Sequence, residues 1–258
     1  SGVKEQKSKP TQQSVNLLRQ RGIQPDIVIG RCSQLLDESV KERISMFCDI
    51  EKDAVITGLD VDNVYRIPLV FYEEGILTIL NRKLHLSIAP GLENWENLVS
   101  RMHRGEKTIK IALCGKYTKL EDSYASVIEA IRHASAHCNV KAEVHWIETT
   151  SIEEGKVSVA TALNGMDGVI VPGGWGSRGI EGKIEVIRFA RENNIPYLGL
   201  CYGMQLAVIE YARNQCGLTG AHTTEVNPKT IHPVVDLLPE QRNVSNLGGT
   251  LRLGGHEI

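Results

Sequence analysis

A short run around Cys201 constrains the fold of this chain more than any other feature. Tyr197-Leu198-Gly199-Leu200 is typical of a β-strand, and it passes through Gly-x-Cys-x-Gly directly into a helical pattern. A strand-to-helix turn with a reactive residue at its tip is the pattern of a nucleophile elbow, where glycines give the room that the turn needs. A thiol there lies at a helix N-terminus, whose dipole favours the thiolate. We therefore predict acyl chemistry on the sulfur of Cys201.

Strand and helix patterns alternate along the chain, which predicts an α/β fold of two parallel-sheet units covered by helices. Strands are expected at residues 25–30, 54–57, 109–114, 144–146, 168–171 and 197–200. Helices are expected at 11–21 and in three segments that each present one apolar, core-facing side, formed by Val40, Ile44 and Phe47, by Tyr124, Val127, Ile128 and Ile131, and by Ile184, Ile187 and Ala190. The pattern weakens between 87 and 107. We therefore expect a first domain at 1–90, a linker at 91–107 and a second domain at 108–258.

Composition narrows the function classes. The formal net charge is −2, which gives no reason to expect a nucleic acid or an anionic membrane as partner. No apolar run approaches the roughly 20 residues that span a bilayer. The six cysteines show neither CxxC pairs nor regular spacing, which favours neither a metal site nor a disulfide framework and predicts a reducing, cytoplasmic location. All except Cys201 are expected at core or boundary positions: Cys32, Cys48, Cys114, Cys138 and Cys216.

A glycine-dense loop precedes the elbow by about one βα unit. It reads Val171-Pro172-Gly173-Gly174-Trp175-Gly176-Ser177-Arg178-Gly179 and follows a predicted buried strand. Glycines let backbone N–H groups approach a ligand closely, as the stabilisation of a tetrahedral oxyanion requires. Alone, such a loop is more often a plain turn. Together with the elbow, it makes Gly174 and the backbone of Tyr202 candidates for an oxyanion hole.

These segments, with Thr223-Thr224-Glu225 beyond them, closely resemble the CTP synthase family, whose glutaminase domain is a class I glutamine amidotransferase. The resemblance extends to the N-terminal segment, where 7–12 and 23–26 look like the end of the family's synthetase domain. It implies a partial Rossmann-like synthetase domain followed by a flavodoxin-like glutaminase domain. Further matching runs are Gly115-Lys116-Tyr117-Thr118, 123–128, 191–196 and Gly248-Gly249-Thr250-Leu251-Arg252-Leu253-Gly254.

The resemblance implies an enzyme that aminates UTP to CTP with ATP and magnesium, using ammonia from glutamine. By position Cys201 matches the nucleophile, and the residues that match glutamine binding are Gly174, Tyr202, Gly203, Met204, Gln205 and Glu225. The residues that match the pyrimidine-nucleotide site are Lys7, Ser8, Lys9, Pro10, Thr11, Gln12 and Arg43. Those that match a stretch near ATP are Leu59, Asp60 and Val61. The family also implies CTP as inhibitor, GTP as activator, and homotetramers or filaments.

Two family elements have no match in this sequence. The glycine-rich phosphate loop G-x-x-x-x-G-K-[ST] does not occur, so ATP and its Mg²⁺ are expected to be held in a part that precedes this chain. The family's His-x-Glu pair, which supplies the base, is expected beyond Ile258. His256-Glu257 does not replace it, because adjacent residues of a strand point to opposite sides. The elbow also carries Tyr202 where the family commonly has leucine.

Other readings remain open. The chain could belong to another class I glutaminase or cysteine hydrolase, or to a catalytically silent assembly module. His222 lies close in sequence to Glu225 and could approach the site, although a surface or structural role is more usual. His133 and His137 have the i, i+4 spacing of two metal ligands, but a third ligand is not apparent and a solvated helix face is favoured.

Overall fold

The chain forms two compact units, Ser1–Arg101 (unit 1) and Met102–Ile258 (unit 2). A computed structural model describes residues 6–116, 121–174 and 176–237. Within these ranges no helix is long and apolar enough to cross a membrane. Each unit has its own hydrophobic core. This agrees with the two α/β units expected from the sequence.

Unit 1 combines a short parallel sheet with helices. Its helices are α1 (Lys9–Gln20), α2 (Glu38–Cys48), α3 (Ile67–Glu73), α4 (Ile76–Leu84) and most of α5 (Glu93–His103), which ends two residues past the unit boundary. It also has 3₁₀ turns at Lys52–Ala54 and Val64–Arg66. Strands β1 (Val28–Cys32) and β2 (Val55–Leu59) pair in parallel from Val28 opposite Val55 to Cys32 opposite Leu59. The expected strand at 25–30 therefore begins three residues later than predicted.

Helix α2 covers the core of unit 1 with a face that differs from the expected one. Val40, Ile44 and Cys48 are buried, while Phe47 is 55% exposed. Each step of four residues turns the helix by about 40°, so Val40, Ile44 and Cys48 form one stripe, and Phe47 lies at its Val40 edge, about 100° from Cys48. The assignment of Phe47 to the buried face was wrong.

The expected linker contains helix α5. Its Trp95 indole N–H donates to the Tyr65 carbonyl at 2.7 Å, and the two rings lie 5.9 Å apart. These contacts join the helix to the 3₁₀ turn before α3. The weak apolar pattern of 87–107 therefore hid an element that long-range contacts stabilise.

Unit 2 contains a parallel four-stranded sheet in the order β4-β3-β5-β6. Its strands are β3 (Lys107–Gly115), β4 (Val140–Glu148), β5 (Gly168–Val171) and β6 (Tyr197–Gly199), followed by the short pair β7 (His222–Thr223) and β8 (Pro233–Val235). Its helices are α6 (Ala125–Cys138), α7 (Thr149–Glu153), α8 (Val159–Ala162), α9 (Ile180–Glu192) and α10 (Tyr202–Asn214), with a 3₁₀ turn at Glu121–Tyr124. The expected bounds of β5 are confirmed.

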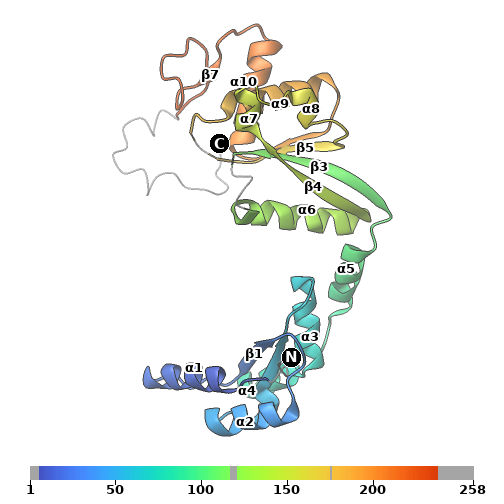
Figure 1. The fold of residues 1–258 in the computed structure, drawn as a ribbon, viewed down its shortest axis with the longest axis vertical. Coiled ribbons are helices and arrows are strands. Elements are labelled where there is room, and N and C mark those ends of the chain that lie inside the picture. The colour runs from blue at the N-terminus through green and yellow to red at the C-terminus, as the bar shows by residue number, and fades with distance from the viewer. Residues whose placement is uncertain (1–5, 117–120, 175, 238–258) are drawn as a thin grey trace. The chain divides into compact units, whose positions relative to one another are not determined.

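The strand order makes unit 2 a doubly wound sheet. From β3 the chain steps outward to β4, then returns to β5 and continues to β6 in the opposite direction. Because βαβ crossovers are right-handed, the reversal puts helices on both faces. Figure 1 shows α6 on one face of the sheet and α9 and α10 on the other. The order is flavodoxin-like, with a switch point between β3 and β5 where such folds bind ligands.

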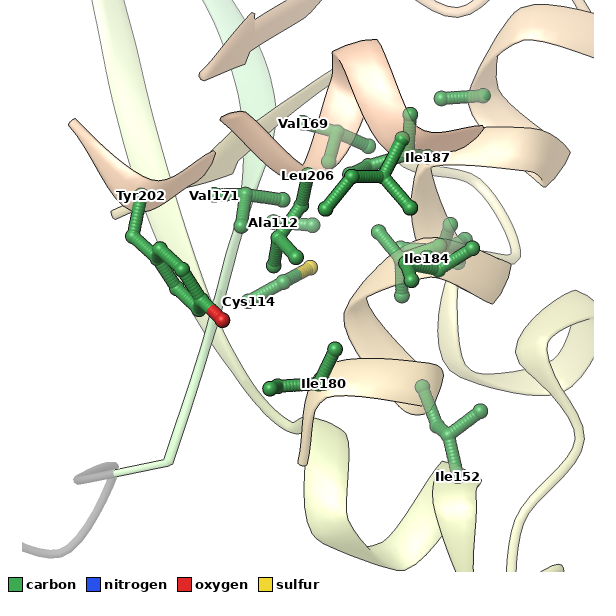
Figure 2. Packing of buried hydrophobic residues seen from close by; sticks show 14 residues of the cluster. Ala112, Cys114, Ile152, Val169, Val171, Ile180, Ile184, Ile187, Tyr202 and Leu206 are labelled. Atoms are coloured by element: carbon green, nitrogen blue, oxygen red, sulfur yellow. The ribbon is translucent and has the colours of Figure 1, made fainter. Parts of the chain in front are cut away.

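The core of unit 2 lies between the sheet and helices α9 and α10. Figure 2 shows Tyr202, from the start of α10, among residues of β3 and β5 that include Cys114 and Val171. The expected face of α9 is confirmed, since Ile184, Ile187 and Ala190 are buried.

Helix α9 also approaches α7 very closely. A methyl group added at Gly182 would lie 2.0 Å from the carbonyl oxygen of Thr149. Only a residue without a side chain fits this contact. Glu153 of α7 accepts hydrogen bonds from the backbone N–H groups of Gly179 (2.6 Å) and Glu181 (3.3 Å) at the start of α9.

Candidate active site

The elbow predicted around Cys201 is present. Cys201 lies between β6 and α10 with φ 52° and ψ −108°, a backbone conformation that is strained for a residue with a side chain. Its side chain is exposed, while the next two residues are buried. The turn therefore presents the thiol at the first turn of α10, where the helix N-terminus favours an anion.

The two glycines of the elbow are required by close backbone approach. A methyl group at Gly203 would lie 2.0 Å from the Val171 carbonyl oxygen, and one at Gly199 would lie 2.7 Å from the backbone of Gly203 and Met204. The Tyr197 hydroxyl also donates to the Gly203 carbonyl at 2.8 Å. The turn is so sharp that the end of β6 and the start of α10 nearly touch.

Three loops meet at the carboxyl edge of the sheet. Lys116 follows β3, Pro172 to Gly174 follow β5, and Cys201 follows β6, and these three strands are parallel neighbours. A methyl group at Gly173 would lie 3.3 Å from Cys201 Cβ and 3.7 Å from its Sγ. The glycine loop thus passes directly beside the thiol, at the switch point of the sheet.

The glycine loop has the conformational freedom expected of it. Gly174 has φ 135° and Gly176 has φ 94°. Methyl groups at these positions would lie 3.6 Å from Lys116 Cε and 3.5 Å from Lys116 Nζ. The buried Lys116 therefore brings a positive charge beside the loop, a feature for which the sequence analysis assigned no role.

A second lysine, Lys183, lies beneath this loop and was missed. It is 2% exposed, and its Nζ lies 3.5 Å from the Pro172 carbonyl oxygen and 5.9 Å from the centre of the Tyr202 ring. Burial lowers the pKa of Lys183 to about 8, with a further lowering by Lys116. The helical spacing predicted its burial, because position 183 lies three residues after Ile180 and four before Ile187 on the apolar face of α9.

Glu225 is exposed in the loop after β7, where its backbone N–H donates to the Thr223 hydroxyl at 3.3 Å. Burial, then the charges of Glu225 and Glu181, raise the pKa of Tyr202 to about 12. Met204 is exposed on the first turn of α10 and Gln205 is half-buried. The glutamine-binding candidates after Cys201 thus share one short stretch, and Glu225 lies apart from it in sequence.

His222 is engaged with a charged group. Its Nδ1 accepts from the Thr223 backbone N–H at 2.9 Å, and its Nε2 lies 3.8 Å from the Glu181 carboxylate, which also binds Arg213 at 2.8 Å. Burial, then Arg213, lowers the pKa of His222. These contacts favour the structural role for this histidine.

Metal binding finds no support in the part of the chain that the structure describes. It contains no group of three or more His, Cys, Asp or Glu side chains that could hold a metal ion. His133 and His137 are both exposed on α6, as a solvated face requires.

In unit 1, the residues matched to a pyrimidine nucleotide begin helix α1. Ser8 is buried and accepts a hydrogen bond from the Gln12 side chain at 3.1 Å, whereas Lys7 and Lys9 are exposed. The preceding Gln6 donates to the Leu35 carbonyl at 2.7 Å and accepts from the Asp37 N–H at 2.9 Å. This anchors the segment to the loop that follows β1.

The stretch matched to ATP contacts the end of β1, where that loop begins. Leu59 ends β2, and the Asp60 N–H donates to the Cys32 carbonyl at the end of β1 (2.8 Å). Asp60 also pairs with Arg31 at 2.8 Å. Arg43 is exposed on α2, where its Nε donates to the Ser39 carbonyl.

The six cysteines are all free thiols, and they differ in environment. Cys48 and Cys114 are buried and Cys32 is half-buried, as expected. Burial raises the pKa of Cys114 to about 12, which keeps it a neutral thiol. Cys138 and Cys216 are exposed, so the expectation of core or boundary positions was wrong for these two. Cys138 is the last residue of α6 and Cys216 lies two residues after the end of α10, and apolar packing ends at both places.

Family comparisons agree with this geometry. The family described as glutamine amidotransferase class-I matches residues 119–257, and the family described as CTP synthase N-terminus matches residues 1–86. The first match covers more than half of the chain. The chain therefore belongs to the class I glutamine amidotransferase family.

Similar curated proteins are CTP synthases. Those of Pyrococcus furiosus and Thermococcus gammatolerans are 48% and 49% identical over 99% of this chain, and that of Moorella thermoacetica is 46% identical over 97%. The chain spans 46 to 48% of the length of these three relatives. A solved glutaminase domain of Trypanosoma brucei CTPS with bound acivicin is 35% identical, with a TM-score of 0.47 and 52% of each chain covered.

Several sequence-based expectations fall on residues outside the described ranges. These are the matching runs that include Tyr117-Thr118 and Gly248 to Gly254, the loop residue Trp175, and His256-Glu257.

Proposed function

We propose that this chain is part of a CTP synthase and carries its glutaminase nucleophile. The observation that supports this most strongly is the strained, exposed Cys201 at the carboxyl edge of the sheet, in a chain of which 99% matches a CTP synthase at 48% identity. In the proposed reaction the parent protein aminates UTP to CTP with ATP, and glutamine hydrolysis supplies the ammonia.

The glutaminase step begins when the Cys201 thiolate attacks the side-chain amide carbon of glutamine. A C–S bond forms, and the carbonyl electron pair moves to oxygen. The backbone N–H groups of Gly174 and Tyr202 stabilise this oxyanion. Collapse breaks the C–N bond, and a protonated general acid gives ammonia its proton. Water then hydrolyses the glutamyl thioester. Met204, Gln205 and Glu225 contact the substrate in this scheme.

The proposal for unit 1 is a nucleotide site around the loop after β1. It is supported by the hydrogen bonds of Gln6 to that loop and of the Asp60 N–H to Cys32 at the end of β1, where the loop begins. Lys7 and Lys9 meet phosphate there, with Arg43 as a further basic contact. Magnesium with ATP is assigned to the rest of the parent protein, so no metal-dependent step is derived from this chain.

The remaining parts of the proposal concern the whole protein. We propose a cytoplasmic homotetramer, activated by GTP and inhibited by CTP, without nucleic acid or membrane as partner. The six free thiols support the reducing location.

Cys201→Ala in the full-length protein tests the central proposal. Glutamine-dependent CTP formation should fall by at least about a thousandfold, because the covalent route is lost. Formation from free ammonia should persist, since it bypasses the thiol. The matched control is Cys216→Ala, which removes another exposed thiol and should leave both activities unchanged. Equal loss of both activities in Cys201→Ala would contradict a separate glutaminase site.

A further inference from the structure

The most unusual buried group of unit 2 is the amine of Lys183. Lysine is almost never fully buried without a partner, yet this side chain is 2% exposed on the apolar face of α9. Its helical neighbours on that face, Ile180 and Ile187, belong to the hydrophobic core. Keeping an ammonium there costs stability, so its location calls for a reason.

The amine reaches the underside of the candidate site. Its Nζ lies 3.5 Å from the carbonyl oxygen of Pro172, at the long end for a hydrogen bond, and over the Tyr202 ring at 5.9 Å. Pro172 directly precedes Gly173, and Tyr202 directly follows Cys201. Lys183 therefore contacts both segments that form the site, at the residue before Gly173 and at the residue after Cys201.

The contact with Pro172 has a geometric consequence. A trans peptide is planar, so its carbonyl and the following N–H point in opposite directions. Holding the Pro172 carbonyl toward the lysine turns the Gly173 N–H away from it. Gly173 is also the loop residue whose added methyl would lie 3.7 Å from Cys201 Sγ. The lysine thereby fixes the orientation of the peptide that passes beside the thiol.

The charges around the amine include the nucleophile. Burial lowers the pKa of Lys183, Lys116 lowers it further, and Cys114 and Cys201 raise it. Near pH 7 the amine is largely protonated, because its pKa is about 8. Cys114 remains neutral in this range, and the carboxylates of Glu181 and Glu225 act on the neighbouring Tyr202. The Pro172–Gly173 peptide that contacts this ammonium is also the one that passes beside the Cys201 thiol.

We propose that Lys183 is a positioning residue of the glutaminase site, whose buried ammonium fixes the Pro172–Gly173 peptide and stabilises the Cys201 thiolate from beneath. This inference rests on the proposed function of Cys201 as nucleophile. It assigns to α9 a part in tuning the thiol, in addition to its part in the core. By linkage, the ammonium and the thiolate stabilise each other equally.

The test is the pH dependence of alkylation of Cys201 by iodoacetamide in the full-length protein, with Cys216 as internal reference. In Lys183→Met, which keeps length and packing but removes the charge, the rate at pH 7 should fall about threefold to tenfold and the midpoint should move to higher pH. The matched control Lys110→Met removes an exposed charge of β3 and should change neither. An unchanged rate and midpoint in folded Lys183→Met would overturn the inference.

A second measurement uses the unaltered protein and does not depend on the folding of a variant. With ¹³C at the lysine Cε atoms, Lys183 is the signal that titrates near pH 8. Capping Cys201 with iodoacetamide should lower that midpoint, since the thiolate that favours the ammonium is gone. An unchanged midpoint would overturn the inference.

The two proposals fail in distinguishable ways. Loss of glutamine-dependent activity in Cys201→Ala, with alkylation unaffected in Lys183→Met, would overturn only the role of Lys183. Retention of glutamine-dependent activity in Cys201→Ala would overturn the proposed function itself.

Discussion

The two units differ in how they present their candidate residues. In unit 2, three loops from adjacent parallel strands converge, so that Lys116, Gly173 and Cys201 come together at one edge of the sheet. In unit 1, the candidates lie at the start of α1 and the end of β2, and Lys9 and Asp60 are exposed. A parallel sheet gathers the residues that follow its strands. The wider sheet of unit 2 therefore forms more of a site within one unit.

Among the variants considered, Gly203→Ala should disturb the site of unit 2 most strongly while leaving unit 1 intact. The added methyl would lie 2.0 Å from the Val171 carbonyl oxygen, with backbone on both sides of the contact. We expect the free energy of unfolding of unit 2 to fall by about 3 kcal/mol or more, and alkylation of Cys201 to lose its preference over Cys216. Hydrogen exchange resolved by peptide should show the loss in β5 and α10 and leave unit 1 unchanged.

The control for this variant is Gly217→Ala. Gly217 also has a positive φ (69°), but nothing lies within 4 Å of an added methyl group. It should cost only about 1 kcal/mol, from backbone strain alone. Equal costs for the two variants would show that the elbow contact is not what makes Gly203 necessary.

Each unit contains a carboxylate that forms an ion pair, and the stability that the two carboxylates contribute can be compared directly. In unit 2 the Glu210 side chain is 1% exposed and binds Arg191 at 2.8 Å, whereas in unit 1 Glu74 is 15% exposed and binds Lys41 at 2.7 Å. Removing Glu210 empties a more buried position and leaves the Arg191 and Asn214 donors without their acceptor. Glu210→Ala should cost about 3 kcal/mol and Glu74→Ala about 1 to 2 kcal/mol, as measured by denaturant unfolding. A larger cost in unit 1 would contradict this order.

The two units should also respond to pH in different ranges. Burial of Glu74 opposes ionisation, but the hydrogen bonds from Lys41 and Thr57 outweigh it and lower the pKa of Glu74. Its contribution to unit 1 is therefore present above the unfolded value of 4.5 and is lost as pH falls. In unit 2 the pKa of Lys183 is lowered from 10.5 to about 8, so the unfolded state binds more protons and stability rises between pH 8 and 10.5.

A last predicted effect, the only stabilising one, follows from that rise. Lys183→Met should stabilise unit 2 at pH 7 by about 2 kcal/mol, because it removes a buried charge, and the gain should shrink toward pH 10.5. Thermal unfolding of variant and parent across this range measures it. A variant that is less stable at pH 7 would mean that the lysine contributes favourable contacts that exceed its desolvation cost.

The sequence predicted what depends on neighbouring residues along the chain. The elbow at Cys201, the bounds of β5 and the buried face of α9 all follow from short-range patterns. Helix α5 was missed because Trp95 makes its contact with Tyr65, thirty residues earlier. Lys183 was missed because residue type suggested an exposed position, although its place in the helical period indicated the core.

The close approach of Gly182 to Thr149 should constrain which residues can evolve at positions 182 and 183. Lys183 is the next residue, so any side chain at 182 would push α9 outward and lift Nζ away from Pro172. Substitution at a position that bears no functional group would then alter the reactivity of a thiol on another loop. Sequences that differ at 182 are therefore expected to differ at 183 as well.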